Sequence, residues 1–302
     1  MTSREPPHPF AALAVFLSFA AGLSPAQAGQ DGAAGAKPLR IVTSFYPIYI
    51  AALNVVGDAA GVELSNLAQA QAGCLRDYQL TTDDMIRLSR ADIFVAHGAG
   101  MESFLDKVVK ERPNLNIVRA ADGIELIKGR GSEGDNPHVW LSVSLYMKEV
   151  GTMAAGLARL DPARADAYRA NAAAYIARLD ALREDMREEL KGLGTRDIVT
   201  FHEAFPYFAR EFELRVAAVI EREPGSEPGA KELAACIGVV RKAGIKALFA
   251  EPQYPARSAE IIARETGAKV WRLDPAVTGP MKADAYVEIM RSNLRVLREA
   301  LK

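Results

Sequence analysis

The chain has 302 residues, of which 49% are hydrophobic, and carries 37 lysines and arginines against 38 aspartates and glutamates. This balance excludes the basic surplus typical of nucleic-acid-binding proteins. The length allows one large domain or two medium-sized domains, and two cysteines are too few for a disulfide framework, so we expect a fold that depends on its hydrophobic core.

The first segment has the pattern of an export signal. Residues 9–23, PFAALAVFLSFAAGL, are apolar but too short to span a bilayer comfortably, and residues 26–28 match the A-x-A cleavage pattern. We therefore expect residues 1–28 to be a signal peptide cleaved near Ala28, residues 29–38 to be a flexible leader, and the mature protein to be periplasmic.

Short apolar runs rich in β-branched residues then alternate with helical patterns. The runs predict strands within residues 39–47, 91–98, 115–120, 196–205, 214–220, 245–252 and 268–275. Residues 81–90, TTDDMIRLSR, open with the Thr and Asp residues that favour a helix start. Apolar strands separated by helices predict parallel sheets covered on both faces. Because this pattern occurs twice, we expect an α/β fold of two lobes, each with a mainly parallel sheet flanked by helices, over residues 39–160 and 195–302.

One long helix is predicted between the two lobes, within residues 161–194. Asp161 and Pro162 suit its start, and Gly192 and Gly194 suit its C-cap. Apolar residues recur every three or four positions, at Tyr168, Ala172, Tyr175, Leu179, Leu182, Met186 and Leu190. At 1.5 Å per residue the helix would be about 45 Å long, which indicates a rigid bridge between the lobes.

Polar side chains follow several of the predicted strands. They are His97, His202, Glu251 and Asp274, and His138 stands in DNPHVWLS, which reads as a turn entering a helix. Ligands of open α/β sheets bind beyond the carboxyl ends of the strands, and imidazoles and carboxylates suit Zn²⁺ and related ions. The motifs G-x-S-x-G, H-E-x-x-H and G-x-G-x-x-G are absent, so catalysis and nucleotide binding are less well supported than metal binding.

The chain also resembles a known family. The segments IVTSFYPIY, RDYQLTTDDMIRLSRADIFVAHGAGMESFLDKV, NPHVWLS, VTFHEAFPYFAREFEL, EPGSEPGAKEL and ALFAEPQY, closing with LDP, are similar in kind and order to the zinc/manganese-type substrate-binding proteins of bacterial ABC transporters. The resemblance covers residues 39–302. It implies a metal ion held between the two lobes, and an exported carrier, which we expect to be a monomer and not an enzyme, that delivers the ion to an ABC transporter permease in the membrane.

The family's metal ligands carry over onto His138, His202 and Asp274. Its first ligand, a histidine, corresponds here to Arg76, whose guanidinium has no lone pair for a cation. Three outcomes stay open: three protein ligands plus water, substitution by His97 or Cys74, or an Arg76–Asp274 pair in a site for a chelated or anionic ligand, or for none. Glu251 is a further candidate, as a ligand or as support for one.

His202 favours Zn²⁺ over Mn²⁺, because manganese prefers more oxygen ligands. Two rival readings are a zinc-dependent hydrolase, with Glu203 or Glu251 as the base, and a family member adapted to adhesion. Cys236 lies in a helical pattern and is expected to be a buried small side chain, although a bridge to Cys74 would join the two lobes.

Overall fold

The computed structural model describes residues 37–68, 75, 78–129, 134–220 and 228–302, which belong to one unit of the chain, Lys37–Lys302. The predicted signal peptide, Cys74 and Arg76 lie outside the described residues. In the part described, no helix combines the length and the apolar character needed to cross a bilayer.

The N-terminal lobe contains a parallel four-stranded sheet in the order β2-β1-β3-β4. Its elements along the chain are β1 (Leu39–Thr43), α1 (Tyr46–Val56), β2 (Val62–Asn66), α2 (Thr82–Arg90), β3 (Ile93–Ala96), α3 (Leu105–Glu111) and β4 (Asn116–Arg119). The central strand β3 is IFVA, buried at every position, as the continuous apolar run predicted. Helix α2 starts with the expected cap, because Thr81 and Asp84 form a capping box.

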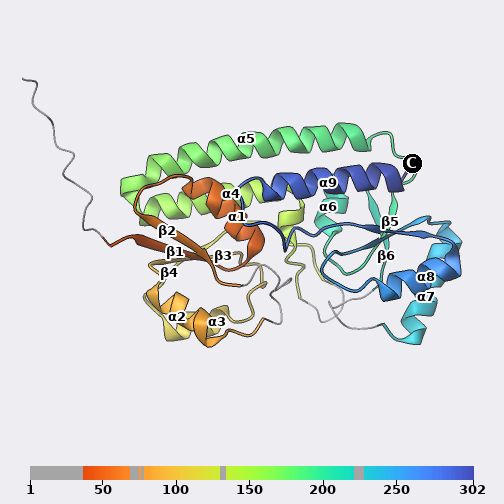
Figure 1. Cartoon of the computed structure of the whole chain (residues 1–302), viewed down its shortest axis with the longest axis horizontal. Helices are drawn as coiled ribbons and strands as arrows, with labels where there is room; N and C mark the ends of the chain where they lie inside the picture. Colours follow the sequence, from red (N-terminus) through yellow and green to blue (C-terminus); the bar gives the residue numbers. More distant parts are fainter. Residues whose placement is uncertain (1–36, 69–74, 76–77, 130–133, 221–227) are drawn as a thin grey trace, which may run out of the picture. The chain divides into compact units, whose positions relative to one another are not determined.

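The C-terminal lobe repeats this arrangement, with a parallel sheet in the order β6-β5-β7-β8. Its elements are β5 (Asp197–Thr200), α6 (Pro206–Glu211), β6 (Arg215–Val219), α7 (Ala230–Ala243), β7 (Ala247–Ala250), α8 (Arg257–Thr266), β8 (Lys269–Arg272) and α9 (Ala285–Ala300). The predicted fold class, two α/β lobes with parallel sheets, is therefore confirmed (Figure 1).

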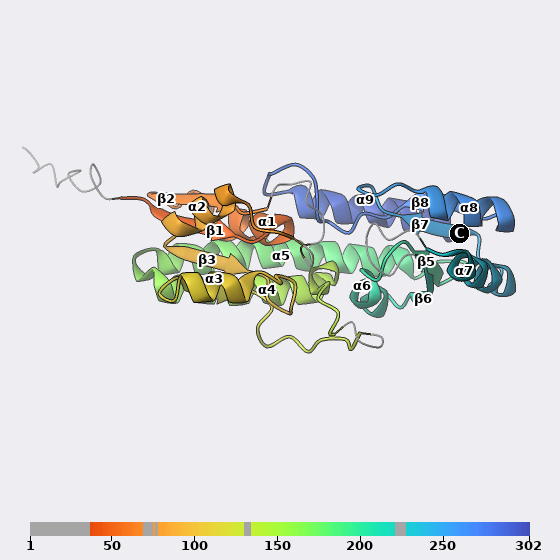
Figure 2. The same cartoon turned by 90° about the horizontal axis from the view of Figure 1, so that it is seen from below.

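Two long helices follow β4 in the chain, α4 (Val143–Leu160), which packs against α1 and β4 of the N-terminal lobe, and α5 (Ala165–Leu190), which connects the lobes. All seven residues of the predicted apolar stripe on α5 are buried, so the helical period identified its packing face. Both views show α5 running beside α9 and extending from the helices of the N-terminal lobe to the C-terminal lobe (Figures 1 and 2).

The two ends of α5 differ from the expected caps. Asp161 accepts hydrogen bonds from the Tyr168 hydroxyl and the Arg164 guanidinium instead of a backbone N–H, and a 3-10 turn (Pro162–Arg164) precedes the helix. The helix ends at Lys191 in a right-handed conformation, and neither Gly192 nor Gly194 has a positive φ. A glycine is required at 194 for a different reason: a Cβ there would lie 2.7 Å from the backbone carbon of Lys302.

One strand, β2, is absent from the sequence prediction. Its sequence VELSN lies at the edge of the sheet and lacks a continuous apolar run, and its apolar/polar alternation covers only the four residues from Val62 to Ser65, the shortest length that indicates a strand. A single hydrophobic cluster includes residues of both lobes, from Ile41 to Leu301. The predicted lobe boundaries at 160/161 and 194/195 remain predictions.

Candidate metal centre

His138 lies in the turn that leads into α4. A 3-10 turn (Val139–Leu141) follows it, and the Ser142 side chain then caps α4 by accepting from the backbone N–H of Leu145 at 3.2 Å, so the predicted turn entering a helix is confirmed. The Asn136 Oδ1 atom lies 3.0 Å from both the backbone N and the ring Nδ1 of His138. Because this oxygen accepts the backbone N–H, it is an acceptor, and the His138 Nδ1 must carry a proton.

His202 follows β5 and is held by a carboxylate on the neighbouring strand. Its Nδ1 pairs with Oε1 of Glu251, which follows β7. The second oxygen of Glu251 accepts from Nε2 of Gln253 at 2.7 Å. His202 and Glu251 are 4% and 2% exposed, so their interaction is shielded from water. Both carboxylate oxygens of Glu251 are engaged, and the contacts favour support of His202 over direct ligation.

The two imidazoles meet through their other nitrogens. Nε2 of His138 lies 3.3 Å from Nε2 of His202, with the rings at an interplanar angle of 70°. Both Nδ1 atoms face oxygen acceptors, so Nε2 is the ring atom that each histidine directs at the other, and without a proton this atom has a lone pair that can bind a cation. Two nitrogens bound about 2.05 Å from one tetrahedral zinc are about 3.3 Å apart. The geometry therefore suits two imidazoles on one ion.

Asp274 follows β8 and is held by the buried Asn293 of α9. The Asp274 backbone N–H donates to Asn293 Oδ1 at 2.9 Å, and Asn293 Nδ2 donates to the Asp274 carbonyl at 2.7 Å. Burial raises the pKa of Asp274 to about 6; the backbone N–H of Ala276 lowers it, and the charge of Glu251 raises it further. Asp274 thus lies within electrostatic reach of Glu251, and a cation would favour its ionised form.

His97 follows β3, as predicted, but its contacts do not suit a ligand. Its side chain is fully buried, with Nδ1 2.7 Å from Glu149 Oε1 and Nε2 2.8 Å from the Pro137 carbonyl oxygen. Both ring nitrogens are therefore engaged within the protein. These contacts favour a supporting role for His97 over its expected use as a substitute ligand.

The predicted residues are thus brought together only in part. His202 contacts both His138 and Glu251. Within the described ranges, however, no three His, Cys, Asp or Glu side chains form a group that could hold an ion. Arg76 and Cys74 lie outside these ranges. Cys236 is a free, buried thiol, as expected for a small core side chain, and burial raises its pKa to about 11.

The sequence did not identify four supporting residues: Asn136, Glu149, Gln253 and Asn293. Glu149 and Asn293 lie inside helices where a polar residue is ordinary, so nothing local marks them. Asn136 stands in the quoted NPHVWLS segment, and His138, two positions further on, was the signal that could have identified its role.

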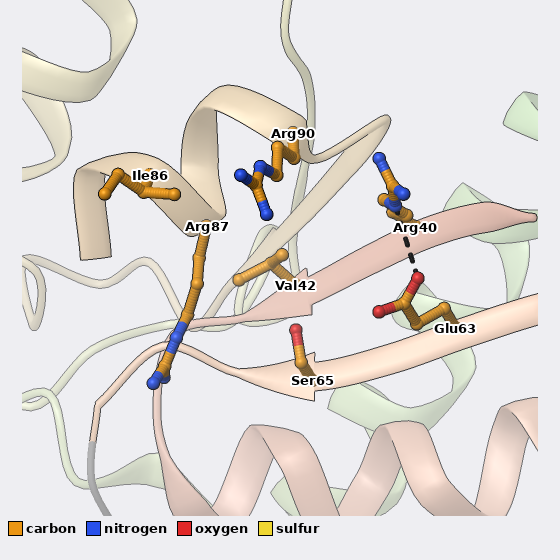
Figure 3. A pocket seen from close by; sticks show the side chains of 7 residues that line it. All are labelled: Arg40, Val42, Glu63, Ser65, Ile86, Arg87 and Arg90. Carbon is orange, nitrogen blue, oxygen red and sulfur yellow. Dashed lines mark hydrogen bonds and ion pairs between the residues drawn. The ribbon is translucent and has the colours of Figure 1, made fainter. Parts of the chain in front are cut away.

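A surface pocket of ~140 Å³ lies elsewhere in the N-terminal lobe (Figure 3). Its lining side chains come from β1, β2 and α2: Arg40, Val42, Glu63, Ser65, Ile86, Arg87 and Arg90. Arg40 Nε lies 3.2 Å from Glu63 Oε2. This pocket includes none of the predicted site residues, and it is separate from the histidine pair.

A family comparison agrees with the resemblance seen in the motifs. Residues 41–300 match the model of the ZnuA family, described as the periplasmic component A of a zinc-uptake complex. The chain is 29% identical over 312 residues to the high-affinity zinc uptake system protein ZnuA of Bacillus subtilis (strain 168), covering 97% of this chain and 96% of that protein. It is 30% identical to the zinc-binding protein AdcA of Streptococcus pyogenes serotype M6, covering 86% of this chain but only 55% of AdcA.

A solved structure shows the same fold. The substrate-binding protein FpvC of Pseudomonas aeruginosa, in complex with Mn²⁺, is 34% identical, with a TM-score of 0.79; the match covers 88% of this chain and 98% of that one. The family model covers most of the chain, and FpvC exceeds 30% identity over nearly its whole length. The chain therefore belongs to the ZnuA family of zinc-uptake components.

Proposed function

We propose that this chain is an exported solute-binding protein that captures one divalent transition-metal ion between its lobes and delivers it to an ABC importer. The ion is Zn²⁺, with Mn²⁺ as the alternative. His138, His202 and Asp274 are its protein ligands. The protein acts as a monomer, after removal of the signal peptide near Ala28.

The observation that supports this proposal best is the facing pair of Nε2 atoms, 3.3 Å apart. Each imidazole comes from a different lobe, and each has its Nδ1 held by an oxygen acceptor behind it. This is the usual arrangement of metal-binding histidines, in which an acceptor fixes the tautomer and the orientation of the ring. Two imidazoles favour zinc over manganese.

The contacts of Glu251 argue against the hydrolase alternative. A zinc hydrolase needs a base that can take a proton from the metal-bound water. Both oxygens of Glu251 are engaged, with His202 and Gln253, so this carboxylate supports a ligand and is not poised as a base. The relatives named above are binding proteins, and we infer that this chain is one too.

Metal analysis and a competition titration test the proposal. We expect one zinc ion per chain, bound more tightly than Mn²⁺, and no metal-dependent hydrolysis of generic ester substrates. A chain that takes up no zinc or manganese at any accessible concentration would contradict metal capture. Turnover of esters that requires zinc and is lost in His202→Ala would favour the hydrolase instead.

A further inference from the structure

A fully buried ion pair lies behind the turn that carries His138. His97 and Glu149 are both 0% exposed, and His97 Nδ1 lies 2.7 Å from Glu149 Oε1. In the described part of the chain neither carboxylate oxygen makes a well-aligned hydrogen bond, so the contact is an ion pair alone. A buried charge with so little compensation is a poor source of stability, which points to another role for the pair.

The second ring nitrogen of His97 contacts the backbone of this turn. Nε2 lies 2.8 Å from the carbonyl oxygen of Pro137, and because a carbonyl only accepts, Nε2–H is the donor. The same carbonyl accepts the backbone N–H of Val139 at 2.8 Å. This carbonyl belongs to the peptide group that joins Pro137 to His138, so the two hydrogen bonds fix the plane from which the His138 side chain extends.

His97 is itself held in place. Its backbone N–H donates to Glu102 Oε1 at 2.7 Å, and its ring lies edge-on to Trp140 with the ring centroids 5.2 Å apart. Trp140 in turn donates its indole N–H to the carbonyl of Pro275 at 2.8 Å, directly after Asp274. The contacts of His97 therefore extend to the loop of a second predicted ligand.

We propose that His97, oriented by Glu149, is a positioning residue that sets the place of the His138 ligand through the Pro137 carbonyl. This inference rests on the proposed function, since the exact orientation of His138 matters only if it binds the ion. A ligand has to be held within about 0.5 Å of its productive position. Groups that orient a metal ligand in this way are typically worth about 10–100-fold in metal affinity.

The charge state of His97 agrees with this role. Burial alone lowers the pKa of its imidazole, but the charge and contact of Glu149, the charge of Glu102 and the Pro137 carbonyl outweigh it, so the pKa lies above its ordinary value. A protonated ring carries a positive charge that attracts the Glu149 carboxylate beside Nδ1, and it keeps the Nε2–H that donates to the turn.

Two double variants of the full chain separate positioning from stability. His97→Leu with Glu149→Leu replaces the ion pair by apolar side chains, which is often neutral or stabilising for the fold, and removes the donor to Pro137. His97→Gln with Glu149→Leu removes the same ion pair but returns an amide N–H near the former position of Nε2. We expect the first variant to bind zinc about 10–100-fold more weakly than the natural chain, and the second to regain most of that affinity.

The readouts are zinc affinity from competition with a chromophoric chelator, the Co²⁺ absorption spectrum, and the unfolding midpoint of the metal-free chain. If His97 is a positioning residue, zinc affinity and the Co²⁺ spectrum should depend on whether residue 97 has an N–H donor for the Pro137 carbonyl. They should do so regardless of which variant has the higher unfolding midpoint. The proposal is overturned if the Leu/Leu variant binds zinc as the natural chain does, or if the Gln/Leu variant is equally weak.

Should the Leu/Leu chain fail to fold, His97→Gln and His97→Asn in the otherwise natural chain provide the same comparison. The asparagine side chain is one methylene shorter, so its amide does not reach Pro137, and the proposal requires it to bind zinc more weakly than the glutamine variant. A natural chain that binds no zinc refutes the proposed function instead, so the two failures are distinguishable.

Discussion

At the scale of single residues, each histidine of the proposed metal centre is oriented by an acceptor that contacts the ring nitrogen facing away from the ion. Asn136 holds His138, and Glu251 holds His202. In each case an oxygen acceptor fixes the proton on Nδ1 and leaves Nε2 for the ion. Loss of a ligand should therefore lower zinc affinity more than loss of the group that orients it.

His202→Ala should lower zinc affinity by at least about tenfold, because it removes one of the two converging imidazoles. Glu251→Gln should have a smaller effect, since an amide oxygen still accepts from Nδ1. Glu260→Gln, at an exposed position on α8, is the matched control and should bind as the natural chain does. Competition titration measures all three, and an unchanged affinity for His202→Ala would remove His202 from the ligand set.

Arg76→His should tighten zinc binding. The resemblance to the family assigns this position to the first ligand, and arginine has no lone pair and keeps its positive charge. The substitution adds an imidazole and removes that charge. Arg76→Gln, which removes the charge without adding an imidazole, separates the two contributions. If Arg76→His binds zinc equally or more weakly, a chelated or anionic ligand becomes the better interpretation.

At the scale of the elements, α5 is the structural bridge between the lobes. Its buried face packs against α1, α4 and α9, so it contacts elements from both halves of the chain. The exposed face carries charged residues that form ion pairs at a spacing of three positions, such as Arg169 with Asp166. Such exposed pairs contribute little to stability, which leaves the apolar stripe as the main source of stabilisation.

Leu179→Ala, in the middle of that stripe, should destabilise the protein by about 2–5 kcal/mol, because the side chain is fully buried and its removal leaves a cavity. Asp180→Ala, the next residue and exposed, should change stability by about 0.5 kcal/mol or less. Urea unfolding of both variants gives the two free energies. Equal, small effects would show that the bridge helix does not depend on its buried face.

At the scale of the whole molecule, hydrogen bonds from three aromatic side chains connect the halves of the chain. Tyr46 donates to the Pro280 carbonyl at 3.0 Å, Trp140 to Pro275 at 2.8 Å, and Tyr286 to the Trp140 carbonyl at 2.7 Å. Because the halves are connected in this way, we expect an ion bound between them to stabilise the whole folded chain.

Zinc should raise the melting temperature, and a chelator should reverse the rise. A ligand that binds only the native state stabilises it by about 2.7 kcal/mol at a hundredfold excess over Kd. Mg²⁺ is the control ion, because it prefers oxygen ligands and should have little effect. Identical melting curves with zinc and with chelator would indicate that the folded chain does not bind zinc.

The stability of the metal-free chain should fall as the pH rises above about 6.5, the ordinary pKa of histidine. The pKa of His97 is raised in the folded protein, by Glu149 and Glu102 against the effect of burial. The folded state therefore binds this proton more tightly than the unfolded state, so the stabilisation is present at low pH and is lost as the pH passes the raised value.

Urea unfolding at stepwise increasing pH measures this loss. In His97→Gln, which has no titrating group at this position, the corresponding part of the decline should disappear. A decline of the same size in both proteins would assign it to other groups.

Much of the fold could be predicted because its signals are local. The helical period gave the packing face of α5, the apolar runs gave seven of the strands described in the structure, and the NPH motif gave His138 as a candidate. The edge strand β2 was missed because its apolar/polar alternation, from Val62 to Ser65, is only four residues long and no continuous apolar run accompanies it.

Periodicity and apolar runs, which are properties of neighbouring residues, were enough to predict the two-lobe architecture and the bridge helix, and the motifs shared with the family were enough to name His138, His202 and Asp274 as candidates. That two imidazoles separated by 64 positions face one another, and that Glu149 lies beside His97, became visible in the folded structure alone. Such contacts depend on how strands, turns and helices pack, and burial then gives a histidine or a carboxylate a role that its sequence neighbours do not encode.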